Sequence, residues 1–303
     1  MKAAVIDLGT NTFHLIIAEL TGSDVDVIFK TNLPVKLGEG RINDNIIIPE
    51  AFARGIDALT SFKREIDRHQ VEHLSAIATS AVRSATNGKD FVAEAKNRTG
   101  LEINVISGDT EAEFIYQGVK ATGLIGSISL IMDIGGGSTE FIICDEEKIL
   151  WKRSYDLGAA RLQQAYFHSD PISEHDQQAI FSKLETESVD LKKACAEFRP
   201  RHLIGSAGAF ETFAVMTGSG ADKSSNTHGQ IGLPAYFDLA AKLINSTHEE
   251  RETFEGLVKL RVDMIVIASL ITNFVISMAG IEKLSLCRND LKMGVLHGLI
   301  SNT

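Results

Sequence analysis

Residues 4–17 read AVIDLGTNTFHLII, and residues 130–143 read LIMDIGGGSTEFII. The two stretches align without a gap and place Asp7 on Asp133. Each stretch is an apolar run, an Asp, a Gly-containing turn with hydroxyl residues and a second apolar run. This order is typical of a β-hairpin with a carboxylate at its tip. One copy lies in each half, so the sequence predicts a duplicated chain.

The turn in each hairpin has the composition of a phosphate-binding loop. Glycine lets the backbone approach a ligand closely, and successive N–H groups in such a turn can surround phosphate oxygens. A purely structural hairpin explains one such turn, but not two aligned turns that carry Asp at the same place. We therefore expect phosphate to be held across an interdomain cleft by Gly9, Thr10, Asn11, Thr12, Gly135, Gly136, Gly137, Ser138 and Thr139.

Composition narrows the class of protein. A length of 303 residues favours two domains over one. A formal net charge of −10 argues against non-specific binding to nucleic acid. The longest apolar run, residues 264–275, contains polar residues and is too short to span a membrane, so we expect a buried helix there. The 3 cysteines are far apart and no signal peptide is visible, which predicts a cytoplasmic protein with reduced thiols.

Strand and helix patterns alternate, and their order restarts after residues 121–127. This predicts an α/β fold with one domain over residues 1–120, joined by a C-terminal helix within 288–303, and a second over 121–287. The expected strands are residues 2–7, 13–20, one within 25–37, and 73–78, 103–106, 128–133, 140–144, 149–157, 202–204 and 283–286. The expected helices are residues 49–68, 89–99, 111–120 (capped by Asp109 or Thr110), 159–167, 174–198 and 209–216, with a loop or lid at 218–232.

Several ordered motifs resemble one known family. They are DLGTNTFH at residues 7–14, TSAVR at 79–83, ISGDTEA at 106–112, DIGGGSTE at 133–140 and GSAG at 205–208. Together they are similar to the exopolyphosphatase and guanosine pentaphosphate phosphatase family of the actin, hexokinase and sugar-kinase superfamily. The resemblance implies two duplicated actin-like (ribonuclease H-like) domains. The chain stops where longer members continue into helical domains, so it looks like the short form.

The resemblance also assigns the general base. Glu111 opens an expected helix after a Gly turn, and from spacing alone it reads as an acid that stabilises the helix N-terminus. Family members place their water-polarising Glu at the matching position, so the resemblance implies that Glu111 activates water. Glu113 is the less favoured alternative. Arg83 ends the TSAVR motif, and its guanidinium suits bidentate binding of phosphate, although an ion pair would explain it too.

Carboxylates beside the two turns are candidate metal ligands. Asp7 and Asp133 offer the hard oxygens that Mg²⁺ or Mn²⁺ prefers. For Asp7 a metal and a local turn cap are equally good readings, whereas the resemblance favours the metal for Asp133. Glu140 follows the second turn and is expected to orient water or hold the metal, while His14 at the aligned position reads as structural. A third loop facing the cleft is expected from Gly205, Ser206, Ala207 and Gly208, followed by Ala209 where a hydroxyl residue would be usual.

The leading functional hypothesis is an exopolyphosphatase that releases terminal orthophosphate from inorganic polyphosphate with a Glu-activated water and a divalent metal. A guanosine pentaphosphate 5′-phosphohydrolase is the alternative within the fold. No aromatic or apolar base pocket is identifiable, which favours polyphosphate. A non-hydrolytic nucleotide-sensing or partner-binding module is the alternative from another class, and a kinase is a third reading. The expected partners are these phosphate substrates, or a second copy in a homodimer, with no nucleic acid and no membrane.

Overall fold

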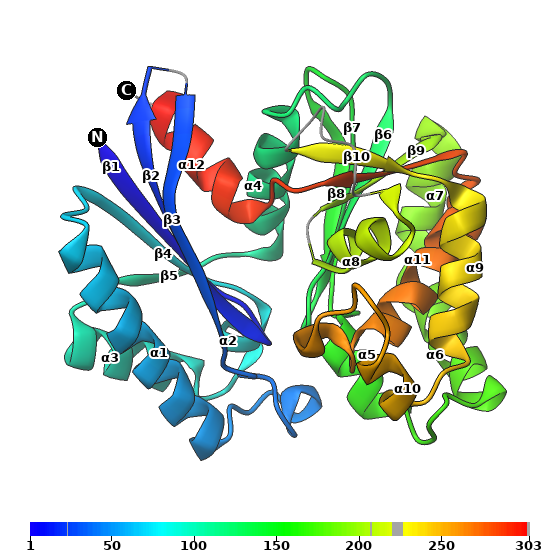
Figure 1. Cartoon of the computed structure of the whole chain (residues 1–303), viewed down its shortest axis with the longest axis horizontal. Helices are drawn as coiled ribbons and strands as arrows, with labels where there is room; N and C mark the ends of the chain where they lie inside the picture. Colours follow the sequence, from blue (N-terminus) through cyan, green and yellow to red (C-terminus); the bar gives the residue numbers. More distant parts are fainter. Residues whose placement is uncertain (23, 207, 220–226, 302–303) are drawn as a thin grey trace. The chain divides into compact units, whose positions relative to one another are not determined.

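The computed structural model describes residues 1–22, 24–206, 208–219 and 227–301. The chain forms two compact units, one of Met1–Ala121 with Leu291–Thr303 and the other of Thr122–Asp290. Each unit is a mixed β-sheet with helices packed on it (Figure 1). The expected α/β class with two domains is therefore confirmed.

The first unit contains a sheet with the order β3-β2-β1-β4-β5. β1 and β2 are antiparallel, as are β2 and β3, whereas β1, β4 and β5 run parallel. Its strands are β1 (Lys2–Leu8), β2 (Thr12–Thr21), β3 (Asp24–Pro34), β4 (His73–Ala78) and β5 (Ile103–Val105). Its helices are η1 (Ile42–Asp44), α1 (Pro49–Arg68), α2 (Ser80–Ser84), α3 (Gly88–Thr99), α4 (Gly108–Lys120) and α12 (Leu291–Ser301).

The second unit contains a sheet with the order β10-β11-β9-β6-β7-β8. Its strands are β6 (Ser129–Ile134), β7 (Thr139–Cys144), β8 (Ile149–Tyr155), β9 (His202–Ser206), β10 (His228–Ile231) and β11 (Lys283–Cys287). Its helices are α5 (Ala159–Tyr166), α6 (Glu174–Glu187), α7 (Val189–Phe198), α8 (Gly208–Met216), α9 (Leu233–Ile244), α10 (His248–Glu252), η3 (Lys259–Arg261) and α11 (Ile265–Ala279).

The two sheets repeat one arrangement. In each, an antiparallel hairpin extends into a third antiparallel strand, and a parallel strand pairs with the other edge of the first. Asp7 pairs in register with His14, and Asp133 pairs with Glu140 at the equivalent place. The duplication read from the aligned sequences is therefore present in the strand register itself.

One face of β1 packs on the hydrophobic core of the first unit, and the other face carries Asp7. Ala4, Ile6 and Leu8 are buried in the hydrophobic cluster that includes residues of α1 and α3. Side chains alternate along a strand, so Asp7 points to the opposite face. There α12 packs against α4 and β1, on the side of the sheet away from α1 and α3 (Figure 1).

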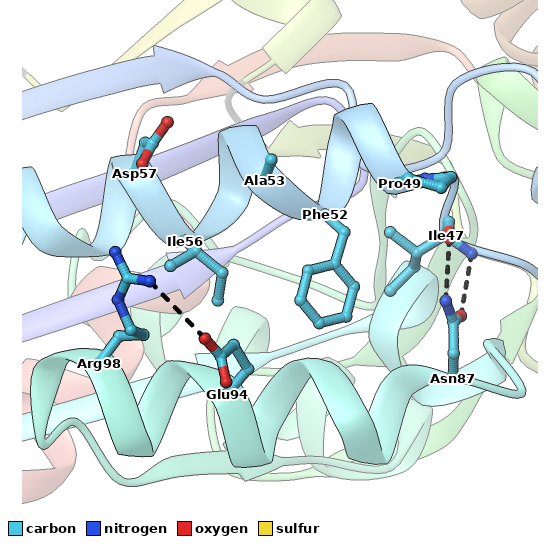
Figure 2. A pocket seen from close by; sticks show the side chains of 9 residues that line it. All are labelled: Ile47, Pro49, Phe52, Ala53, Ile56, Asp57, Asn87, Glu94 and Arg98. Carbon is cyan, nitrogen blue, oxygen red and sulfur yellow. Dashed lines mark hydrogen bonds and ion pairs between the residues drawn. The ribbon is translucent and has the colours of Figure 1, made fainter.

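A groove of about 460 Å³ lies between α1 and α3 (Figure 2). Its floor is apolar and includes Ile47, Phe52 and Ile56. The Asn87 side chain accepts from the Ile47 N–H at 3.0 Å and donates to its carbonyl at 2.9 Å, which fixes the loop before α1. The groove contains none of the residues expected to bind phosphate.

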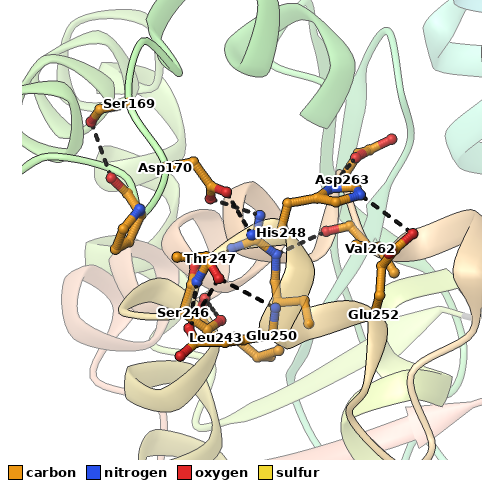
Figure 3. Close-up of polar contacts among 12 residues, drawn as sticks. Ser169, Asp170, Leu243, Ser246, Thr247, His248, Glu250, Glu252, Val262 and Asp263 are labelled. Atoms are coloured by element: carbon orange, nitrogen blue, oxygen red, sulfur yellow. Dashed lines mark hydrogen bonds and ion pairs between the residues drawn. The ribbon is translucent and has the colours of Figure 1, made fainter.

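A buried arginine, Arg251, stabilises one corner of the second unit through bonds to Asp170, Ser246 and Val262. Figure 3 labels these three partners. Arg251 is 2% exposed; its Nε donates to the Val262 carbonyl at 3.2 Å, and its Nη1 donates to the Ser246 carbonyl. Its Nη2 pairs with Asp170 Oδ1 at 3.2 Å. Buried charges are tolerated when they are paired and hydrogen-bonded in this way. The arginine thus ties α10 to the loops on both sides of it.

The apolar run near residue 264 forms the buried helix that was expected. α11 lies in the core, where the hydroxyls of Ser269 and Thr272 donate to the carbonyls of Ile265 and Ala268 at 2.8 Å each. Among the helices that the structure describes, none has the length and apolar character needed to cross a membrane.

Several local expectations were wrong. Ser107, rather than Asp109 or Thr110, caps α4, because its hydroxyl accepts from the Thr110 N–H at 3.1 Å. Ser80–Ser84 form the short helix α2, which was not among the expected helices. Residues 174–198 are mainly helical, as expected, but divide at Ser188 into α6 and α7. Of the stretch expected to be a loop or lid, residues 220–226 lie outside the described residues. In its described part β10 forms by pairing with β11, so tertiary pairing overrides composition there.

Candidate active site

The first turn expected to bind phosphate, residues 9–12, is shaped by its glycine and by the hydrogen bonds of its carbonyls. A side chain at Gly9 would place its Cβ 2.8 Å from the Thr12 carbonyl oxygen, so only glycine fits without a shift. The carbonyl of Thr10 accepts from Gly38 N at 3.1 Å, and that of Asn11 accepts from Lys36 N at 2.8 Å. In a trans peptide the N–H points opposite to the C=O. The N–H groups that follow these carbonyls, those of Asn11 and Thr12, therefore point away from the supporting segment.

The second turn repeats this construction. A Cβ at Gly135 would lie 2.9 Å from the Ser138 carbonyl oxygen. The carbonyl of Gly136 accepts from Ala160 N at 2.8 Å, and that of Gly137 accepts from Arg161 Nε at 2.9 Å. By the same geometry the N–H groups of Gly137 and Ser138 point away from α5. Both turns thus present successive amides on one side, an arrangement suited to anions.

Residues 157–161 support the second turn, a role that was not expected from the sequence. Gly158 packs directly on it, because a Cβ there would lie 2.4 Å from backbone atoms of Gly136 and Gly137. Arg161 is 7% exposed, and its Nε donates to the Gly137 carbonyl of the turn. The available signal was the run LGAAR at residues 157–161, which follows the third strand of the repeat. In the first half, Lys36 and Gly38 likewise follow the third strand and donate to the carbonyls of the first turn.

Glu111 and Arg83 contact one another within the first unit. Arg83 Nη1 lies 2.9 Å from Glu111 Oε2 and 3.1 Å from the Ile106 carbonyl oxygen. The side chains of Arg83 and Glu111 are 25% and 10% exposed. Glu111 stands in the first turn of α4, where the helix dipole and the guanidinium both stabilise a carboxylate. Glu113 is exposed, so the two glutamates that the sequence left in competition have different environments.

The second unit places two carboxylates opposite each other beside its turn. Asp133 and Glu140 are a register pair on β6 and β7, so their side chains share one face of the sheet. Glu140 is 2% exposed and accepts from Ser154 Oγ at 2.7 Å. Ser206 Oγ, at the end of β9, donates to Asp133 Oδ2 at 3.3 Å. The described residues contain no cluster of three or more acidic, His or Cys side chains that would form a metal cage.

This pair of carboxylates fits Mg²⁺ or Mn²⁺ only if phosphate oxygens and waters supply the remaining ligands. Mg²⁺ is commonly held by one or two carboxylates while phosphate oxygens and waters complete its coordination. Asp133 and Glu140 supply two carboxylates, and the N–H groups of the second turn, which are suited to anions, lie next to them in the chain. Asp7 is different: its Oδ2 lies 3.7 Å from Lys292 Nζ, so a cationic side chain already accompanies it.

The third loop is described in part. Gly205 and Ser206 end β9 and Gly208 begins α8, while Ala207 lies outside the described residues. A Cβ at Gly205 would lie 1.9 Å from the Phe210 ring, so that ring packs directly on the glycine. Ala209 is half-buried and packs against the core of the second unit. Of this loop, Ser206 is the residue brought into contact with another candidate, Asp133.

The cysteines take no part in the site. Cys144, Cys195 and Cys287 are buried and unbridged. Burial raises the pKa of Cys195 and of Cys287 to about 12, so these thiols stay protonated at neutral pH. This is consistent with packing roles.

The chain is similar to known proteins in sequence and in fold. The sequence pattern of the Ppx/GppA phosphatase family matches residues 16–303. The crystal structure of an exopolyphosphatase from Cytophaga hutchinsonii superposes with a TM-score of 0.95 at 35% identity, over 100% of this chain and 99% of that one. A Ppx/GppA enzyme from Aquifex aeolicus, 24% identical over 98% of this chain and 99% of that one, has the same fold with a TM-score of 0.81.

Two sequence relatives differ in how much of their length is matched. A protein from Haemophilus influenzae, provisionally named an exopolyphosphatase, is 29% identical over 99% of this chain and 92% of its own. A guanosine-5′-triphosphate,3′-diphosphate pyrophosphatase from Aeromonas hydrophila is 26% identical over 99% of this chain, which spans only 59% of that longer protein. The family and the enzyme class expected from the motifs, a phosphoanhydride hydrolase, are thereby confirmed: the chain belongs to the Ppx/GppA phosphatase family.

Proposed function

We propose that this protein is an exopolyphosphatase, which hydrolyses the terminal phosphoanhydride of inorganic polyphosphate and releases orthophosphate. The observation that carries the proposal is the largely buried Glu111, held by Arg83 next to the helix N-terminus of α4. A fixed carboxylate is what a reaction that activates water requires, whereas a binding module has no need of it. The two amide turns supply the other requirement, which is to hold phosphate oxygens in place.

The reaction follows from these groups. Glu111 accepts a proton from a water molecule while the water oxygen forms a bond to the terminal phosphorus. The bond between that phosphorus and its bridging oxygen breaks, and the shortened chain leaves with the bridging oxygen. Arg83 holds Glu111 in place and offers its remaining N–H groups to phosphate. The turn amides stabilise the charge that develops on the phosphate oxygens, because they are already oriented before the substrate binds.

We propose that Asp133 and Glu140 hold a divalent metal, Mg²⁺ or Mn²⁺, together with substrate oxygens. When bound, the ion would neutralise charge on the phosphates. We expect chelator to abolish activity and Asp133→Asn to raise the Mg²⁺ concentration needed for half-maximal rate. Retention of full activity in excess chelator, with no metal detected by elemental analysis, would exclude the metal.

Polyphosphate is preferred over guanosine pentaphosphate for a specific reason. This chain is 35% identical to the exopolyphosphatase from Cytophaga hutchinsonii, but 26% identical to the Aeromonas pyrophosphatase. The experiment is to measure orthophosphate release from polyphosphate, guanosine pentaphosphate and ATP in parallel with Mg²⁺. The proposal predicts the highest kcat/KM for polyphosphate. A higher value for the guanosine nucleotide would select the alternative, and no release from any of the three would favour a binding module.

A further inference from the structure

Lys292 lies beside the first phosphate turn and has no role in the function proposed so far. Its Nζ is 3.7 Å from Asp7 Oδ2, and the two side chains are 14% and 17% exposed. Asp7 stands near the end of β1, directly before the turn at Gly9. Because both groups are largely buried, salt screens their interaction much less than it screens a surface pair.

The fold fixes where Lys292 stands. α12 packs against α4 so closely that a Cβ at Gly294 would lie 1.8 Å from the Phe114 carbonyl oxygen. Glycine therefore permits backbone contact between these helices, and Lys292 precedes it by two positions on α12. The same α4 carries Glu111 in its first turn, one turn before Phe114. The lysine is thus held on the face of the sheet to which Asp7 points.

The charge of Asp7 is a problem for a turn that binds phosphate. A carboxylate beside the turn repels an incoming phosphate, and the repulsion is stronger in a partly buried site than in water. A cation next to the carboxylate removes this repulsion. The two cations available are a metal ion and a lysine, and the structure provides the lysine at Asp7 but no second carboxylate in register there, since Asp7 pairs with His14.

We propose that Lys292, rather than a metal ion, neutralises the charge of the Asp7 carboxylate, and that this pair sets the affinity of the first turn for a substrate phosphate. Lys292 is then a positioning residue that acts through the charge of Asp7. The divalent metal belongs to Asp133 and Glu140 in the second unit. The inference rests on the proposed function, because it takes condensed phosphate as the ligand of the turn.

The test compares Lys292→Met, Lys292→Arg and the double variant Lys292→Met with Asp7→Asn, using tripolyphosphate. Lys292→Met should raise KM about 10-fold and leave kcat within about threefold, while Lys292→Arg stays close to wild type. Neutralising Asp7 in the Lys292→Met background should recover at least half of the lost affinity on a logarithmic scale, because the repelling charge is gone. The matched control is Lys96→Met, which removes an exposed lysine of α3 that is paired with Glu102.

A second readout does not depend on turnover. Binding of Mn²⁺, followed by electron paramagnetic resonance, should be unchanged in Asp7→Asn and weakened in Asp133→Asn. Weaker Mn²⁺ binding in Asp7→Asn would overturn the proposal, as would an unchanged KM in Lys292→Met or a double variant that recovers nothing. If Lys292→Met does not fold, the Mn²⁺ measurement on Asp7→Asn decides by itself whether Asp7 is a metal ligand. If the wild type hydrolyses no condensed phosphate, the proposed function fails, and calorimetric binding of tripolyphosphate to the same variants still tests the lysine.

Discussion

Arg83 and Glu111 have separate predicted roles, but the position of one side chain depends on the other. The sequence suggested phosphate binding for one and water activation for the other, and the structure joins them by a 2.9 Å ion pair. Arg83 also donates to the Ile106 carbonyl, in the segment that leads into α4. The position of the expected base is therefore set by the arginine.

Arg83→Ala should lower kcat/KM for short and long polyphosphate by a similar factor, about 10²-fold, because every substrate must place its terminal phosphate next to Glu111. The measurement is steady-state kinetics on chains of two defined lengths. Arg83→Lys serves as the matched control, since it keeps the charge but not the planar fork. A loss confined to long chains would place Arg83 away from the reacting phosphate.

At the scale of single elements, the hairpins with their Asp residues were predictable because continuous apolar runs on either side of a Gly-containing turn specify them locally. The boundaries of α1 and β4 were also as expected. Pro49 stands at the start of α1, whose apolar residues recur at helical spacing, and β4 occupies residues 73–78. The contact of Arg161 with the second turn was not predictable, because it depends on where α5 packs after the third strand. The proximity of Lys292 to Asp7 joins opposite ends of the sequence, and no local pattern indicates it.

The segment before α5 should control the second turn. Gly158 has ordinary backbone angles, φ −73° and ψ 155°, so alanine is excluded there only by space. Gly158→Ala should displace the turn, raise KM for polyphosphate at least tenfold and cost about 1–3 kcal/mol of stability. Gly126→Ala is the control, because a Cβ at that exposed position meets nothing within 4 Å. Wild-type kinetics in Gly158→Ala would show that the support of the turn is unimportant.

His202 should make the second unit sensitive to acid. Burial in β9, with a smaller contribution from Lys283, lowers the pKa of His202 from 6.5 to about 4. The unfolded chain therefore binds more protons between these values, so this stability contribution is present above pH 6.5 and is lost as the pH falls towards 4. The contribution lost by pH 5 is on the order of 2 kcal/mol.

Urea unfolding at pH 7.5 and pH 5, followed by the fluorescence of Trp151 in β8, measures this effect in the second unit. In His202→Gln the difference between the two pH values should shrink by about 1–2 kcal/mol. The side chain of His202 bonds Ser285 Oγ at 2.9 Å, and Gln can retain a hydrogen bond there. The same pH difference in the variant and the wild type would assign the acid sensitivity to other groups.

At the scale of the whole molecule, a protein with a net charge of −10 must handle a polyanion. We expect the reacting phosphate to bind through partly buried groups such as Arg83, and distal phosphates to contact exposed Lys and Arg residues. Salt screens exposed charges over about 8–10 Å at physiological ionic strength. Raising salt should therefore weaken binding of long polyphosphate much more than binding of tripolyphosphate. Equal salt dependence of kcat/KM for both lengths would argue against such a basic path.

The central claim is that Glu111 activates the water that attacks polyphosphate. The most direct test is the rate of orthophosphate release by Glu111→Gln beside Glu113→Gln, its exposed neighbour on the same helix. Glutamine keeps the shape but cannot accept the proton, so we predict a fall in kcat of about 10²–10⁴-fold with KM nearly unchanged. Glu113→Gln should behave as wild type. A Glu111→Gln variant that keeps near-normal kcat would contradict the account and leave Glu111 as an acid that only stabilises the start of α4.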